Sequence, residues 1–375
     1  MTPFIYKQLT QALARTLGTP QYLILFLSDF CWMKCRHCWF NEDWKTANLG
    51  KPTLTFDEIE KLAHSMKRVL FLSLTGGEAF TRPDLVEIVK VFSRETKMSR
   101  YQIPTSGFKT DLIISKTGQM LKNHPEIPFR VDVSLDGTEA IHEKIRSVAG
   151  GHRRALDTIR ALNGLKRHHR NFDVGVITTV SHDNQHEIPQ IGRLVESVNP
   201  NGEWMVNIVR GAVRDPNAHN VEIDSYLAAH KLIRDRVESG AYRGHSGHAT
   251  ASWLSAKNAT RRKIIRKRLE GRCRGGGCAA GSLGGVIYSD GTVQACEMLD
   301  QSLGNLRDYD CDLAALWNSP AADKVRRWIQ DTRCQCTQEC FLSISMLIQP
   351  QHWPDIIAER LRLARGAAVR PTAAH

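Results

Sequence analysis

The chain has 375 residues, of which 42% are apolar and 24% charged, as in an ordinary globular protein. These proportions exclude a disordered chain and a coiled coil, and the length suffices for one large domain and a smaller one. The longest apolar run, 22–27, is far shorter than the roughly 20 residues that a membrane helix needs, and no cleavable signal precedes it. We therefore expect a cytoplasmic protein without a membrane partner.

The formal net charge is +12, from 51 basic and 39 acidic residues. Such a charge is compatible with nucleic acid, an acidic substrate or an anionic cofactor. Part of it lies in a segment expected to form a helix, about 252–270, which contains the basic runs 261–263 and 266–268. We interpret these charges mainly as a solvated helix face, with a docking surface for an acidic partner as the alternative. Nucleic acid is therefore not favoured as a partner.

Predicted strands and helices alternate through the first 240 residues. Buried strands are expected at 22–27 and 69–74, and further strands at 100–104, 129–134, 172–180 and 203–208. Helices are expected at 55–67, 83–95, 110–122, 152–168, 186–197 and 224–238. The first of these helices begins with a capping box, Thr55 to Glu58. Strands connected by helices run parallel, with the helices outside. Six such units, in place of eight, predict an α/β fold of the open, partial (β/α)6 TIM-like barrel type.

The pattern changes after residue 240. A β-hairpin is expected at 285–296, turning at Asp290-Gly291, with short helices at 312–317 and 320–331 and an amphipathic helix at 353–363. These elements indicate a small C-terminal α+β domain. We expect an N-terminal extension (1–20), the barrel (21–240), a linker with the basic helix (241–272), the small domain (273–345), and a C-terminal helix and tail (346–375).

Ten cysteines in a cytoplasmic chain indicate metal binding before disulfides, because thiols stay reduced there. Cys31, Cys35 and Cys38 follow the first strand, and no cysteine occurs between residues 39 and 272. Three thiolates leave a tetrahedral zinc site one ligand short. A [4Fe–4S] cluster held by three cysteines instead leaves one iron free to bind something else.

Further motifs follow the next strands. Gly76-Gly77-Glu78 follows the second, Thr105-Ser106-Gly107 the third, and Ser134-Leu135-Asp136-Gly137 the fourth. Because the carboxyl ends of the strands form one rim of a parallel barrel, these motifs should surround a single cavity. The glycines let the backbone approach a ligand closely, and Glu78 offers an anionic partner for an ammonium group.

Together, the cysteine spacing and these motifs resemble the radical S-adenosylmethionine (SAM) superfamily. The chain departs from the family pattern at Trp32, in place of a frequent Asn, and at His37, in place of a frequent aromatic residue. The resemblance implies reductive cleavage of SAM to a 5′-deoxyadenosyl radical, which abstracts hydrogen from a substrate C–H, with an electron donor such as flavodoxin or ferredoxin. It implies a SAM-binding [4Fe–4S] cluster on Cys31, Cys35 and Cys38, and SAM contacts from Gly76, Gly77, Glu78, Thr105, Ser134, Asp136, Arg146 and Val180.

The other seven cysteines lie between residues 273 and 340. Cys278, Gly291 and Cys296 resemble the opening of the auxiliary-cluster domains called SPASM and, in shortened form, twitch. The resemblance implies one auxiliary [4Fe–4S] cluster on Cys273, Cys278, Cys296 and Cys340. Cys334 and Cys336 hold a second cluster or remain free thiols, and Cys311 is expected to be a packing residue. A zinc ribbon is the alternative without a cluster.

The implied function is that of a radical SAM oxidoreductase or maturase, which oxidises or cross-links a peptide or a sugar- or aminocyclitol-type small molecule. About 20 residues precede the first strand, too few for the peptide-recognition domain that many such enzymes carry, so both substrate classes stay open. No catalytic acid or base is predicted. A nucleic-acid-modifying radical SAM enzyme and a non-catalytic metal-binding or electron-carrier protein are the alternatives.

Overall fold

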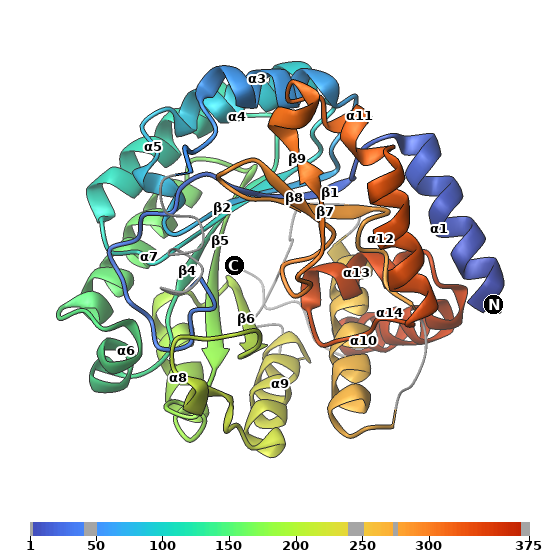
Figure 1. Cartoon of the computed structure of the whole chain (residues 1–375). Helices are drawn as coiled ribbons and strands as arrows, with labels where there is room; N and C mark the ends of the chain where they lie inside the picture. The colour runs from blue at the N-terminus through green and yellow to red at the C-terminus, as the bar shows by residue number, and fades with distance from the viewer. Residues whose placement is uncertain (1–2, 41–50, 239–250, 273–276, 369–375) are drawn as a thin grey trace.

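The computed structural model describes residues 3–40, 51–238, 251–272 and 277–368. A helix, α1 (Pro3–Leu17), precedes six parallel strands that alternate with helices on the outside of the sheet (Figure 1). The expected partial barrel is thereby confirmed. The strands are β1 (Tyr22–Phe26), β2 (Phe71–Thr75), β3 (Tyr101–Thr105), β4 (Phe129–Ser134), β5 (Phe172–Val180) and β6 (Glu203–Ile208). The helices are α3 (Phe56–Ser65), α4 (Leu85–Glu95), α5 (Thr110–Asn123), α6 (Glu139–Arg146), α7 (Gly151–Lys166), α8 (Ile188–Val198) and α9 (Ile223–Glu238).

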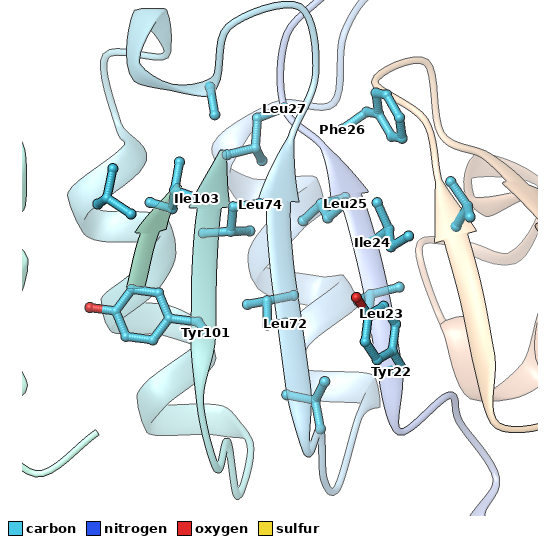
Figure 2. Close-up of a cluster of buried hydrophobic side chains, with 14 of the residues drawn as sticks. Tyr22, Leu23, Ile24, Leu25, Phe26, Leu27, Leu72, Leu74, Tyr101 and Ile103 are labelled. Carbon is cyan, nitrogen blue, oxygen red and sulfur yellow. The ribbon is translucent and has the colours of Figure 1, made fainter. Parts of the chain in front are cut away.

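Local sequence signals account for these elements. At the start of α3, the Thr55 hydroxyl accepts a hydrogen bond from the Glu58 backbone N–H, and the Glu58 carboxylate accepts one from the Thr55 N–H at 2.8 Å. This is the predicted capping box, which satisfies N–H groups that the first helical turn leaves without partners. Along β1 all five side chains are buried, as expected for a parallel strand covered on both faces. Figure 2 shows the apolar side chains of β1 beside those of β2 and β3.

The small domain is joined to the barrel through the sheet itself. Strand β7 (Gly284–Ile287) pairs in parallel with β1, and β8 (Thr292–Gln294) and β9 (Ser302–Asn305) continue antiparallel. The resulting nine-stranded sheet has the order β6-β5-β4-β3-β2-β1-β7-β8-β9. A Cβ on Gly285 would lie 2.7 Å from the Trp317 ring, so glycine lets this aromatic side chain pack directly on β7. Helices α11 (Leu313–Trp317) and α12 (Pro320–Asp331) complete the expected α+β elements.

Three further helices lie on the open side of the barrel, between α9 and α12 in Figure 1. They are α10 (Ala251–Leu269), α13 (Glu339–Leu347) and α14 (Trp353–Ala368), and α10 contacts α9, α13 and α14. The basic helix was therefore predicted correctly as a helix, but its interpretation as a solvated face is wrong for Arg261. That guanidinium donates a hydrogen bond to the Ser343 hydroxyl, across the contact between α10 and α13.

The helices of the described ranges do not combine the length and the apolar composition needed to cross a bilayer.

Candidate active site

A cavity of about 290 Å³ opens at the carboxyl ends of the barrel strands, and we call it the outer cavity. The cysteine loop, the Gly-Gly turn after β2 and the ends of β3 and β4 all contribute to its wall. The structure thus brings together segments that are far apart in the sequence, as the rim argument predicted. Of the predicted site residues, Cys31, Cys35, Cys38, Gly76, Gly77, Thr105, Ser134 and Arg146 line this cavity.

The cysteine loop is held on two sides by backbone hydrogen bonds. On one side, the Arg36 N–H donates to the carbonyl of Ile145 at 2.8 Å, at the end of α6. On the other, the Arg214 N–H donates to the carbonyl of Cys38 at 3.0 Å. The segment that follows β6 therefore helps to fix the position of the three thiols.

Glycine is required after β2 because two backbone segments touch there. The Gly77 N–H donates to the carbonyl of Ser28 at 2.7 Å, just ahead of the cysteine loop. A Cβ on Gly76 would lie 2.4 Å from the Ser28 carbonyl oxygen, and one on Gly77 would lie 2.4 Å from that of Phe30. Side chains at either position would push the Gly-Gly turn away from the cysteine loop.

Glu78 is buried behind the cavity wall and does not line the cavity. Its Oε2 accepts hydrogen bonds from the Thr105 hydroxyl at 3.0 Å and from the Ser106 hydroxyl at 2.7 Å and N–H at 3.0 Å. Burial raises the pKa of Glu78, although the hydrogen bonds from Ser106 and Thr105 oppose this shift. In this structure Glu78 therefore positions the turn after β3, and its contact with an ammonium group stays a prediction.

Arg146 connects the cysteine loop to a buried carboxylate. Its Nη1 donates to Cys35 Sγ at 3.5 Å, and its Nε donates to Asp136 Oδ2 at 2.6 Å. Burial is the largest influence on Asp136 and opposes its ionisation, but Arg146, the two nearby histidines and the hydrogen bond from the Thr179 N–H together lower the pKa of the carboxyl. His37 lies 3.9 Å from the same oxygen, and burial lowers the pKa of its imidazole to about 4, so it is neutral near pH 7. Asp136 thus orients Arg146 from outside the cavity.

The last predicted SAM contact, Val180, has its side chain in the hydrophobic core. The neighbouring Thr179 lines the outer cavity, together with Asn207, Arg210 and Arg214. Sequence reasoning missed these four residues. The signal that identified the others, a position at the carboxyl end of a barrel strand, applies to them as well, since they follow or end β5 and β6.

Four cysteines of the small domain interact with one another. Cys278 is close enough to Cys334 and Cys336 for their charges to raise its pKa. The charges of Cys278 and Cys336 likewise raise the pKa of Cys296. Burial is the largest influence on each of these two thiols and raises the pKa of Cys278 to about 12.

The remaining cysteines of this domain have other surroundings. Cys340 contacts the Tyr22 hydroxyl and lies near Glu297 and Arg210. Cys311 is buried among Glu58, Lys61 and Arg307, which fits a packing residue. Cys273 was predicted as a ligand and lies outside the described residues.

The donor set is rich in cysteine thiols, which are the ligands of iron–sulfur clusters. Within the described ranges, no three His, Cys, Asp or Glu side chains lie close enough together to hold one ion, as a zinc ribbon requires. Thiolates that bind the separate irons of a cluster do not have to converge on one point. Burial raises the pKa of Cys31 to about 12 and of Cys38 to about 11, so these thiols must release protons when they bind iron.

Comparison with known families defines the class of protein. The model of the radical SAM superfamily matches residues 25–195, and that of the SPASM iron–sulfur cluster-binding domain matches residues 278–341. Residues 25–195 are therefore a domain of the radical SAM type, and residues 278–341 are a domain of the SPASM type. Both matched models belong to families that use iron–sulfur clusters, and the first also uses SAM.

Individual relatives are distant. The chain is 28% identical to the pre-heme d1 synthase of Dinoroseobacter shibae over 236 residues, 61% of this chain and 54% of the relative. It is 24% identical to the PqqA peptide cyclase of Rhodopseudomonas palustris over 200 residues, 52% of this chain and 49% of the relative. It thus spans about half the length of these curated relatives.

A similar solved structure is native anSMEcpe with bound AdoMet and the Kp18Cys peptide. It has a TM-score of 0.58 and 14% identity, and the match covers 92% of this chain and 98% of that one. This likeness supports the fold.

Proposed function

We propose that the enzyme binds a [4Fe–4S] cluster through Cys31, Cys35 and Cys38 and binds SAM in the outer cavity. The observation that carries this proposal is that one cavity is lined by the three thiols, the Gly-Gly turn, Thr105, Ser134 and Arg146. The reaction would then be hydrogen abstraction from an unactivated C–H bond of the substrate.

When bound, the cluster and SAM supply the electron transfer and the radical chemistry, and the protein supplies position and electrostatics. Arg146 places a positive charge beside Cys35 Sγ. Asp136 fixes the orientation of Arg146, and Glu78 fixes the turn that carries Thr105 and Ser106. The exposed backbone at Gly76 and Gly77 lets a ligand approach the chain closely.

For the auxiliary cluster, we propose Cys278, Cys296 and Cys336 as ligands, because their thiols interact with one another. Cys273, Cys334 and Cys340 are the candidates for the fourth position. Cys334 interacts with Cys336, whereas Cys340 lies beside Tyr22. Iron counting on Cys334→Ala and Cys340→Ala, each after anaerobic reconstitution, would identify the ligand, because only loss of a true ligand should lower the iron content.

A peptide is the substrate class to test first, since one relative is named as a peptide cyclase and one similar structure holds a peptide. Sugar- and aminocyclitol-type molecules are the second class. The electron donor is proposed to be a flavodoxin or a ferredoxin.

The deciding experiment measures 5′-deoxyadenosine released from SAM by the anaerobically reconstituted enzyme with dithionite. Cys35→Ala should abolish the release, because a cluster ligand is lost. Cys296→Ala should retain SAM cleavage but not turn over substrate, and Cys311→Ala is the control for loss of a thiol elsewhere. Wild-type protein that binds iron without cleaving SAM would refute the proposal.

A further inference from the structure

A second and larger cavity, of about 670 Å³, lies inside the barrel, and we call it the inner cavity. It shares Ile177, Asn207 and Arg210 with the outer cavity, so the two adjoin. From there it extends to the amino ends of the strands, where Tyr22 and Phe71 line it. Helices α10 and α13 supply its wall on the open side of the barrel.

The two carboxylates that line the inner cavity are already paired. Glu203 forms an ion pair with Arg130 and accepts a further hydrogen bond from Asn258 at 3.3 Å. Glu339 lies 2.5 Å from Arg210 Nη1. Each carboxylate therefore already has an arginine partner, although Glu203 also lies close enough to Lys257 to raise its pKa.

Three other cations of the lining have no such counterion. In the described part of the chain, no carboxylate lies within ion-pair distance of Arg100, Lys257 or Arg261. Arg261 donates from Nη1 to the neutral Ser343 hydroxyl at 2.8 Å, and Arg100 lies over the Phe71 ring, 5.6 Å from its centroid. The buried Nε atoms of both arginines lack a hydrogen-bond partner among the described residues.

Arg261 and Arg100 both act on Lys257. Burial, followed by the charge of Arg261, lowers the pKa of Lys257 to about 7, and Arg100 acts in the same direction. Half-buried positive charges that lie close together are unfavourable unless a group of opposite charge joins them. The remainder of the wall includes large apolar side chains, among them Phe71 and Trp204. The cavity therefore suits a molecule with an anionic end and an apolar body.

We propose that the inner cavity binds an anionic group of the substrate, a carboxylate or a phosphate, between Arg100, Lys257 and Arg261. The apolar part of the substrate would then extend toward the outer cavity. The volume is that of a typical small-molecule site and admits a small molecule or the end of a peptide. This inference rests on the proposed function, because it assigns the bound anion to the substrate of that reaction.

The test uses isothermal titration calorimetry of the reconstituted enzyme with octanoate, octyl phosphate and the neutral octanol. Both anions should bind more tightly than octanol, and the tighter of the two identifies the group. Lys257→Met and Arg261→Gln should each weaken anion binding by roughly tenfold or more, since each removes a charge-assisted contact, and should leave octanol binding unchanged. Arg266→Gln is the matched control, because Arg266 lies on the same helix and pairs with Glu270 at 2.9 Å.

Thermal unfolding followed by circular dichroism verifies that each variant is folded. Lys257→Arg should retain the anion binding of the wild-type enzyme, because it keeps the positive charge. Octanoate and octyl phosphate affinities within twofold of wild type in folded Lys257→Met and Arg261→Gln would overturn the proposal. So would equal binding of octanol and the anions to the wild-type enzyme. Failure of the wild-type enzyme to cleave SAM would count against the proposed function alone, because anion binding is read independently.

Discussion

Replacing Gly77 by alanine should displace the Gly-Gly turn, which forms part of the wall of the outer cavity. A Cβ at position 77 would lie 2.4 Å from the carbonyl oxygen of Phe30 and 2.6 Å from its carbon. Real Cβ atoms essentially never approach other atoms closer than 3.0 Å, so the turn must move by at least 0.6 Å. The movement also stretches the hydrogen bond from the Glu78 N–H to the Phe30 carbonyl, which is 2.8 Å long.

Two effects of different size follow for Gly77→Ala. Overpacking of this kind costs about 1–3 kcal/mol of the free energy of unfolding. A misplacement of about 1 Å near the reacting groups lowers a rate roughly 100-fold, so SAM cleavage should fall about tenfold or more. Urea unfolding and the rate of 5′-deoxyadenosine release, both measured anaerobically on reconstituted protein, give the two quantities.

Gly118→Ala is the matched control, because a Cβ there would meet no heavy atom within 4 Å and the residue lies inside α5. Alanine in a helix interior should stabilise the protein by about 0.5–1 kcal/mol, with SAM cleavage unchanged. Equal urea midpoints and equal cleavage rates for the Gly77→Ala and Gly118→Ala variants would show that the contact with Phe30 does not constrain the site.

Three further changes test other parts of the structure. Arg146→Met leaves Asp136 buried without its counterion and should cost about 3–5 kcal/mol in urea unfolding; a loss below about 1 kcal/mol would contradict the ion pair. Burial raises the pKa of Asp132 from 3.8 to about 6, because the folded state favours the neutral carboxyl. The contribution of the neutral carboxyl to the free energy of unfolding is therefore complete below pH 4 and is lost as the pH rises through 6. Asp132→Asn should therefore stabilise the protein at pH 7 by up to about 3 kcal/mol and leave it unchanged at pH 3, and a gain independent of pH would disprove this cause. Cys336→Ala should lower the iron content from about eight toward about four per chain, while Cys311→Ala should not, and equal iron in both would remove Cys336 from the ligands.

Much of the outer cavity was predictable because its residues follow one rule. The motifs at Gly76, Thr105 and Ser134 stand at strand ends, and parallel strands bring their carboxyl ends to one rim. The same rule did not separate residues that face the cavity from those behind it. Glu78 and Asp136 turn away to hydrogen-bond the cavity wall, because a buried carboxylate requires donors or a cation.

For the basic helix α10, by contrast, the sequence did not predict which side chains face the barrel. Its charge pattern predicted a helix but gave no information about which helix face meets the barrel. The position of Arg261 depends on where α10 packs against α13, a contact between segments about 80 residues apart. Helix α1 was not predicted either, since the first 20 residues carry no motif and were described only as an N-terminal extension.

By itself, the sequence determined the two domain types of this protein: the cysteine spacing and the strand-end motifs identified a radical SAM domain and a SPASM domain. The first signal is local, because Cys31, Cys35 and Cys38 occupy one loop. Only the tertiary structure decided how the two domains share one sheet through β1 and β7, and which cations meet inside the barrel. Burial and pairing of charges depend on the packing of distant segments. The inner cavity, with Arg100, Lys257 and Arg261 in its wall, therefore has no counterpart in any sequence motif.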